Sequence, residues 1–240
     1  MGSVIPLKKS ANSAYLDLKN ILNAKLDSVE KLIHSKLESE VELIKEMSDY
    51  HLGSGGKRIR ALLTMGAAKL GGYSHGSRDV NLAACVELIH SATLLHDDVI
   101  DESKVRRGTK TANSIWGNQS PILVGDYLLS RCFEMMVEDG SLEILRLLSS
   151  TSSKIAQGEV LQLTYKGEAD LLEENYIKII SLKTAALFSA ATRVGACIAG
   201  LDKKKKEALE SYGKNIGLAF QIADDALDYF SKEKVFGKEI

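Results

Sequence analysis

Proline is scarce in this chain, because only Pro6 and Pro121 occur in 240 residues. Proline removes a backbone donor and breaks the interior of a helix, so its scarcity leaves long segments free to be helical. Strict alternation of apolar and polar residues, which is typical of half-buried strands, is also hard to find. These two absences predict an all-α protein.

Cysteine is almost as rare. Cys85, Cys132 and Cys197 are widely spaced within apolar segments. This pattern supports neither a disulfide framework nor a zinc site, and it predicts buried thiols in a reducing compartment. No uncharged apolar run approaches the roughly 18 to 20 residues that span a bilayer, and residues 1–10 lack the apolar core of a secretion signal. We therefore expect a cytoplasmic protein without a membrane span.

Neither sign of charge is in excess, since 31 Lys and Arg balance 32 Asp and Glu to give a formal net charge of −1. This balance argues against nucleic acid or an anionic membrane as a partner. Any anion must then be bound by a local cluster of cations. Hydrophobic residues make up 45% of the chain and no linker divides it, so we expect one domain over residues 1–240.

Apolar residues recur at spacings of three and four along most of the chain, which predicts a bundle of about ten or fewer helices. The helix expected at 79–101 is apolar nearly all round and should lie at the centre of the protein. The expected helices cover residues 14–47, 59–70, 79–101, 121–138, 141–163, 173–199 and 203–230.

Two aspartate clusters carry the first chemical signal, DDVID at 97–101 and DDALD at 224–228. On a helix, the first and last Asp of each cluster share a face and can grip one cation together. Mg²⁺ prefers such carboxylates, with waters and substrate phosphates completing its shell. A solvated helix end would explain one isolated cluster. Both clusters follow strongly apolar segments, which favours a metal site over two surface faces.

Two basic clusters could hold the phosphates. A glycine turn at 55–56 precedes Lys57 and Arg60, at the expected start of a helix where free N–H groups and the helix dipole favour an anion. Arg106 and Arg107 follow the first aspartate cluster, and guanidinium groups match phosphate oxygens in a bidentate manner. Taken alone, the glycine turn would equally fit a surface loop.

Other polar residues give weaker signals. His90 lies two helical turns before Asp97 on roughly the same face, although a lone histidine there is more typical of a core. Gln221 lies one turn before the second aspartate cluster and shares its face. The pair Lys183 and Thr184 indicates little by itself.

Taken together and in this order, the motifs resemble the polyprenyl synthetase family of trans-isoprenyl diphosphate synthases, and most closely its bacterial long-chain branch, which includes octaprenyl diphosphate synthase. The resemblance implies the isoprenoid synthase fold, a helical bundle around a central apolar cavity. In the family the chain continues beyond the second aspartate cluster, so we expect a domain truncated at its C-terminus. The resembling segments are GGKRIR at 55–60, ELIHSATLLHDDVIDESKVRRG at 87–108, GD at 125–126, GEV at 158–160, KT at 183–184 and GLAFQIADDALD at 217–228.

The resemblance implies a homodimeric trans-prenyltransferase with two or three Mg²⁺ ions, which joins isopentenyl diphosphate head-to-tail to an allylic diphosphate such as farnesyl diphosphate. It places isopentenyl diphosphate on Lys57, Arg60, His90 and Arg107. It places the allylic diphosphate near Arg106, Lys183, Thr184 and Gln221. The implied metal ligands are Asp97, Asp101, Asp224 and Asp228. The implied catalytic residues are Asp97, Asp98, Asp101, Lys183, Asp224 and Asp225.

Product length should depend on the side chains one to two turns before Asp97, because the growing tail must run alongside that helix. Ala92 and Thr93 occupy these positions and are small, where short-chain members of the family carry bulky aromatics. We therefore predict a membrane-soluble product longer than about twenty carbons, with C40 for a quinone side chain as the candidate. Phe133 or Met136 could form a floor deeper in the protein.

Two alternatives remain. A metal-dependent phosphohydrolase would use His96 beside Asp97, but it would need more histidines at ligand spacing than the chain offers. A non-catalytic or truncated subunit of a prenyltransferase would have no physical need for six buried carboxylates.

Overall fold

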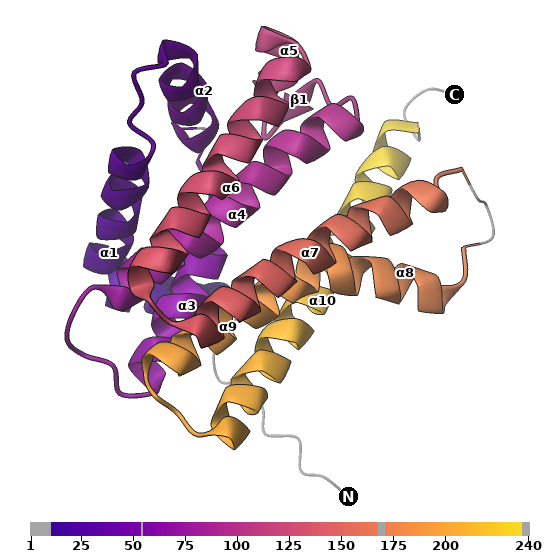
Figure 1. Cartoon of the computed structure of the whole chain (residues 1–240). Coiled ribbons are helices and arrows are strands. Elements are labelled where there is room, and N and C mark those ends of the chain that lie inside the picture. The colour runs from indigo at the N-terminus through magenta and orange to yellow at the C-terminus, as the bar shows by residue number, and fades with distance from the viewer. Residues whose placement is uncertain (1–10, 54, 168–170, 237–240) are drawn as a thin grey trace, which may run out of the picture.

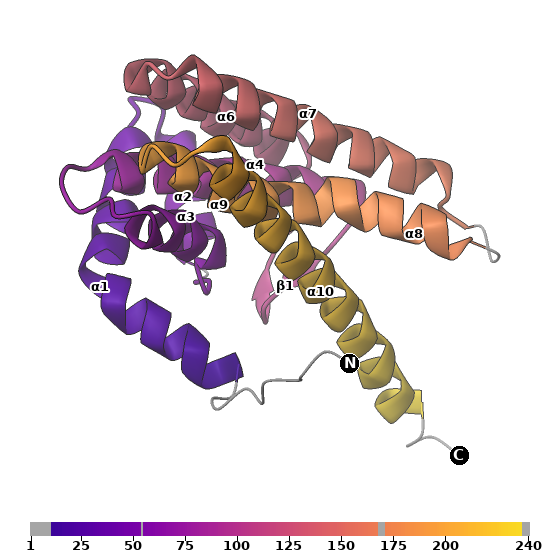
Figure 2. The ribbon, with the colours of Figure 1, turned by 90° about the horizontal axis from the view of Figure 1, so that it is seen from below.

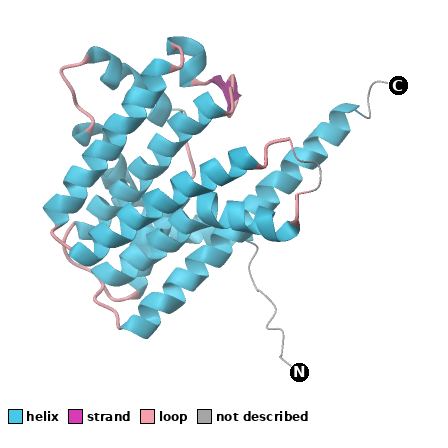
Figure 3. Ribbon diagram, turned by 45° about the vertical axis from the view of Figure 1, so that its right-hand side comes forward, coloured by secondary structure: helices cyan, strands magenta, loops and turns pink. Residues whose placement is uncertain are grey.

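The computed structural model describes the backbone of residues 11–53, 55–167 and 171–236, and the side chains of 13–53, 55–167 and 171–228. Residues 1–10 and 237–240, at the two ends of the expected domain, lie outside this part. The described chain is helical apart from one short hairpin of strands β1 (Val105–Arg106) and β2 (Thr109–Lys110) (Figure 3). The helices are α1 (Ala11–Lys36), α2 (Glu42–Gly53), α3 (Ile59–Leu70), α4 (Arg78–Ile100), α5 (Ala112–Trp116), α6 (Gln119–Asp139), α7 (Leu142–Thr164), α8 (Glu173–Ile180), the π-helical segment η1 (Ser181–Ala185), α9 (Ala186–Ile198) and α10 (Lys203–Phe236).

Helix α4 forms the centre of the bundle. It contacts α1, α3, α6 and α9 (Figure 1). Most of its apolar side chains are buried, and Leu82, Leu88 and Leu95 are 0% exposed, although Ile100 at its end is 39% exposed. The predictions of an all-α protein and of a central helix near 79–101 are confirmed. Among the described helices, none is both long and apolar enough to cross a membrane.

The prediction of one helix over 14–47 is wrong in one respect, because the helix is interrupted between α1 and α2. The Ser39 hydroxyl accepts a hydrogen bond from the Val41 amide at 3.1 Å, and such local bonds compete with the helical ladder. The break allows Leu37 and Met47, on either side of it, both to be buried. The expected helix 173–199 also differs, since η1 separates α8 from α9.

The three cysteines are free. Cys85 and Cys132 are buried between α4 and α6, where the Cys132 thiol lies 3.4 Å from the Cys85 carbonyl oxygen. The prediction of buried thiols is wrong for Cys197, which is only partly buried.

Helix α10 packs closely on α9 and η1 through glycine. A Cβ added at Gly217 would lie 2.6 Å from the Cα of Ala185, which is closer than carbon atoms approach without displacement. Beyond this contact the C-terminal half of α10 extends away from the bundle (Figure 2). Residues 222–228 in this half are exposed.

Candidate active site

A cleft of about 1150 Å³ opens between α3, α4, α7, η1 and α10. Most of the predicted site residues line it, although they come from distant parts of the sequence. Ala92, Asp98, Phe133 and Met136 are the exceptions. The predicted residues that line the cleft are Lys57, Arg60, His90, Thr93, Asp97, Asp101, Arg106, Arg107, Lys183, Thr184, Gln221, Asp224, Asp225 and Asp228.

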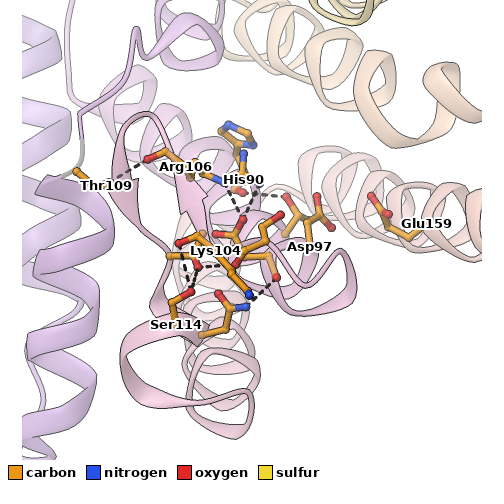
Figure 4. Close-up of polar contacts among 12 residues, drawn as sticks. His90, Asp97, Lys104, Arg106, Thr109, Ser114 and Glu159 are labelled. Atoms are coloured by element: carbon orange, nitrogen blue, oxygen red, sulfur yellow. Dashed lines mark hydrogen bonds and ion pairs between the residues drawn. The ribbon is translucent and has the colours of Figure 1, made fainter. Parts of the chain in front are cut away.

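The first aspartate cluster lies where α4 ends. Asp97 is only 9% exposed, and burial raises its pKa to about 7, with Glu159 and Asp101 adding to the rise and Lys183 opposing it (Figure 4). A carboxyl group in this environment holds its charge at a cost, because water has been removed and nearby carboxylates repel it. A bound cation would remove that cost.

Asp98, the second residue of the cluster, does not line the cleft. Its side chain is buried against Arg106, whose Nε and Nη2 atoms each lie 2.8 Å from Asp98 Oδ1. The β1–β2 hairpin carries Arg106 back to this position. The structure therefore gives Asp98 contact with a predicted phosphate-binding arginine, where the family resemblance implied a catalytic carboxylate.

The second aspartate cluster is exposed on α10, as is Asp101 of the first, so the expectation of six buried carboxylates is wrong. Asp225 accepts hydrogen bonds from the Tyr176 hydroxyl at 2.7 Å and from Gln221 Nε2 at 2.9 Å. Thr184 Oγ1 donates to Gln221 Oε1 at 2.7 Å. A hydrogen-bonded chain thus runs from η1 through α10 to α8. Burial, followed by the bond to Asp225, raises the pKa of Tyr176 to about 12, so its hydroxyl remains a donor at neutral pH.

The two clusters together fit a magnesium site shared with a ligand. Asp97 and Asp101 on α4 and Asp224 and Asp228 on α10 all line the same cleft. Within the described residues, however, no three His, Cys, Asp or Glu side chains lie close enough to hold a metal alone. Mg²⁺ is commonly bound by one or two carboxylates, with waters and substrate phosphates as its remaining ligands. The all-oxygen donor set and its division between two helices match that mode.

The glycine turn before α3 is held by charged residues from elsewhere. Buried Glu87 of α4 accepts a hydrogen bond from the Ala61 amide at 2.9 Å, which satisfies one of the free N–H groups at the start of α3. Arg107 Nη1 donates to the Gly55 carbonyl oxygen. Arg58, in the left-handed region at φ 47°, turns toward Glu87 and the Leu52 carbonyl oxygen.

Arg60 and His90 line the adjacent part of the cleft. The Arg60 guanidinium lies 4.5 Å from the centre of the Phe188 ring, and its Nε has no hydrogen-bond partner among the described residues. Burial lowers the pKa of Arg60 to about 10 and, with the Arg60 charge, lowers that of His90 well below its ordinary value. At neutral pH the site therefore presents a charged guanidinium beside a neutral imidazole.

The π-helical segment η1 presents Lys183 to the cleft. Lys183 Nζ lies 2.8 Å from Glu159 Oε2 and 3.9 Å from Asp97 Oδ2. Helix α7 comes so close that a Cβ added at Gly158 would lie 2.7 Å from the Lys183 backbone nitrogen. Only glycine tolerates this approach without a shift of the backbone.

Two residues of the site, Glu159 and Tyr176, carried no predicted role. Glu159 follows Gly158 in one of the segments that resemble the family, which was a usable signal. Tyr176 precedes Lys183 by seven residues, a spacing of about two helical turns. That signal was weaker, because the intervening helix is interrupted by η1.

The chain matches the Polyprenyl synthetase family model over residues 41–240. It belongs to the polyprenyl synthetase family. The predicted family and the isoprenoid synthase fold are therefore confirmed. The chain is 44% identical over 212 residues to octaprenyl diphosphate synthase of Escherichia coli (strain K12), a match that covers 88% of this chain and 65% of that protein. This chain therefore spans just under two thirds of the length of that relative.

Solved structures of the family agree with the fold. The crystal structure of a polyprenyl synthase from Caulobacter crescentus CB15, complexed with calcium and isoprenyl diphosphate, matches with a TM-score of 0.89 and 46% identity. This match covers 93% of the present chain and 67% of that one. Relatives differ in product class, since a short chain isoprenyl diphosphate synthase of Methanothermobacter thermautotrophicus is 36% identical over 215 residues, or 88% of this chain and 66% of that protein.

Proposed function

We propose that the protein is a trans-prenyltransferase that joins isopentenyl diphosphate to an allylic diphosphate. The observation that carries this proposal is the single cleft in which two aspartate clusters and two groups of basic side chains converge. The octaprenyl diphosphate synthase relative supports it. The matched family member complexed with isoprenyl diphosphate supports the same substrate class.

The two substrates would bind at the two basic groups. Lys57, Arg60, His90 and Arg107 would hold isopentenyl diphosphate beside the glycine turn. Arg106, Lys183, Thr184 and Gln221 would hold the allylic diphosphate between the aspartate clusters. Guanidinium and ammonium groups match diphosphate oxygens in charge and geometry.

Breaking the allylic carbon–oxygen bond leaves a carbocation and pyrophosphate, so the chain must stabilise negative charge on the leaving group. Two or three Mg²⁺ ions held by Asp97, Asp101, Asp224 and Asp228 would supply Lewis acidity at that leaving group. Lys183 and Arg106 would direct fixed positive charge at the same oxygens. The isopentenyl double bond would attack the allylic carbon, and departing pyrophosphate would take the proton that is lost.

The product is proposed to exceed about twenty carbons. Thr93 lines the cleft one turn before Asp97, whereas Ala92 is 0% exposed and faces the packed core. Of the two small side chains, Thr93 is therefore the one beside the space into which a tail would grow. Met136 is buried in the core and Phe133 is 42% exposed on α6, so neither lies at the floor of the described cleft.

A homodimer is proposed from the outer face of α6. Leu123, Phe133 and Val137 are 67%, 42% and 67% exposed on this helix. A patch of large apolar side chains on one helix is typical of a surface that another protein covers. Sedimentation of the purified protein would test the proposal, and a monomer at micromolar concentration would reject it.

Mass spectrometry of the products formed from isopentenyl diphosphate, farnesyl diphosphate and Mg²⁺ tests the proposed activity. We expect all-trans diphosphates longer than about twenty carbons. Thr93→Phe should shorten them to about twenty carbons, a single addition to the farnesyl primer, because the ring occupies the path of the tail one turn, or about 5.4 Å, below Asp97. Phosphate release without elongation would instead indicate a phosphohydrolase. That reading already lacks support from His96, whose Nε2 lies 3.0 Å from the Ile122 carbonyl oxygen on α6.

A further inference from the structure

We propose that Glu159 is a positioning residue that holds the Lys183 ammonium group ready for the allylic diphosphate. This inference rests on the proposed function, because it assigns Glu159 a part in binding that substrate. Glu159 projects from α7 into the same cleft as Asp97 (Figure 4).

Glu159 holds Lys183 in place but does not use all the hydrogen-bond donors of its ammonium group. A lysine ammonium group has three donors. Glu159 Oε2, at 2.8 Å, takes one of them, while Asp97 Oδ2 at 3.9 Å lies beyond hydrogen-bond distance. Two donors therefore remain for phosphate oxygens. Without Glu159, Lys183 could turn to Asp97 and cover a predicted metal ligand.

The backbone places Glu159 at this position. Because Gly158 lets α7 approach the Lys183 backbone nitrogen, the next side chain along α7 arrives beside the Lys183 side chain. A free lysine side chain samples many rotamers, and fixing it costs conformational entropy. Holding it in place before the substrate arrives removes that cost from the binding step, which is a general source of affinity.

The second oxygen of Glu159 gives an independent indication. Glu159 Oε1 is buried and has no hydrogen-bond partner among the described residues. A buried carboxylate oxygen without a donor is unfavourable. Since Glu159 lines the cleft, a donor that arrives with the hydrated metal and diphosphate can satisfy it.

The proposal makes a prediction opposite to that of simple charge repulsion. Glu159→Gln removes a negative charge beside an anion site, so electrostatics alone would tighten diphosphate binding. A positioning role predicts weaker binding, because Lys183 loses the charged acceptor that holds it and keeps only a weaker amide oxygen. Glu159→Asp further distinguishes the positioning role from charge repulsion. It keeps the negative charge but shortens the side chain by one methylene, which moves the carboxylate away from Lys183.

The first experiment measures binding of inorganic pyrophosphate with Mg²⁺ by titration calorimetry. We expect Kd to rise about tenfold or more in Glu159→Gln and Glu159→Asp, as for a lost charge-assisted hydrogen bond. In a protein that already carries Lys183→Ala, the two Glu159 substitutions should not change Kd, because the ammonium group through which Glu159 acts is gone. Unchanged or tighter binding in Glu159→Gln, or an effect that persists in full without Lys183, would overturn the proposal.

The second experiment uses steady-state kinetics of the full chain. Glu159→Gln should raise KM for the allylic substrate about tenfold and leave KM for isopentenyl diphosphate within about twofold. Glu143→Gln is the matched control, because Glu143 also lies on α7 and is 49% exposed, and its pair with Lys206 of α10 at 2.8 Å lies outside the cleft. An equal rise in both KM values would contradict the assignment. If the wild-type protein elongates no substrate, the proposed function fails. The pyrophosphate titrations with and without Lys183→Ala would still decide whether Glu159 acts through Lys183.

Discussion

The two aspartate clusters have the same sequence pattern but different surroundings. In the first, at the end of α4, Asp98 is paired with Arg106 and Asp97 lies near Lys183, and both are buried, whereas Asp101 is exposed. The second is exposed on α10, and Asp225 is held there by hydrogen bonds from Tyr176 and Gln221. The first cluster is thus fixed by packing and carries an unfavourable charge, whereas the second depends on contacts between α10, η1 and α8.

The largest expected effect tests whether the clusters are equal in function despite this difference. Asp97→Ala and Asp224→Ala should each lower turnover by about a thousandfold, because each removes a charge needed to hold the metal in the transition state. Turnover and circular dichroism should be measured together, to show that the helices persist. EDTA should abolish activity and Mg²⁺ restore it. A loss below about tenfold for Asp224→Ala would mean that only the buried cluster holds metal.

Gly217→Ala should affect the second cluster selectively. The added methyl group would meet Ala185 at 2.6 Å, so α10 must move away from η1. We expect a stability loss of about 1–3 kcal/mol from overpacking and a fall in turnover of about a hundredfold from misplacement of the second cluster. KM for isopentenyl diphosphate should hardly change, because none of the residues of its proposed site lies on α10 or η1. Lys214→Ala, exposed on the same helix, is the control.

Asp97→Asn should stabilise the metal-free protein. Burial raises the pKa of Asp97 from 3.8 to about 7, so the unfolded chain releases this proton at lower pH than the folded one. Wild type therefore loses stability as pH rises from about 4 to 7, by as much as about 4 kcal/mol, and the variant does not. Denaturation in EDTA should show a gain of about 1–4 kcal/mol above pH 7 that shrinks toward pH 4.

Asp224→Asn is the matched control for this gain. Asp224 is exposed, and substitutions of exposed side chains change stability by about 0.5 kcal/mol or less. The comparison between the clusters would fail if Asp224→Asn stabilised the protein as much as Asp97→Asn did. It would also fail if the gain from Asp97→Asn were independent of pH.

Tyr176→Phe should have the smallest effect. It removes one hydrogen bond to Asp225, of 2.7 Å, and such a bond contributes about 0.5–1.5 kcal/mol. We expect turnover to fall about three- to tenfold, with the melting temperature nearly unchanged. Tyr212→Phe, on the exposed surface of α10, should leave turnover as in wild type. An unchanged turnover in Tyr176→Phe would show that Gln221 alone orients Asp225.

Much of the fold and the cleft could be predicted because their residues lie on regular helices. Helical periodicity identified α4 as the central helix, and spacing along α4 and α10 put Asp97 and Asp101, and Asp224 and Asp228, on shared faces. These inferences need only the local geometry of one helix.

The remaining features depend on contacts between distant segments. Asp98 meets Arg106 because the β1–β2 hairpin folds back, and two-residue strands leave almost no pattern in a sequence. Glu159 meets Lys183 because α7 passes close to η1 at Gly158. The different exposure of the two aspartate clusters depends on what packs around each helix end. Apolar residues precede both clusters, LL at 94–95 and AF at 219–220, so periodicity could not distinguish their exposure.

The π-helical segment also sets the rotational phase between two helices that both meet α10. Tyr176 on α8 reaches Asp225, while Phe188 on α9 packs on Phe220 with ring centres 5.4 Å apart. Each residue of an α-helix turns the chain by about 100°. If all five residues of Ser181–Ala185 instead wound as an ordinary α-helix, α8 would be rotated by about a quarter turn relative to α9, because a π turn holds about one residue more than an α turn. One of the two contacts with α10 would then have to break.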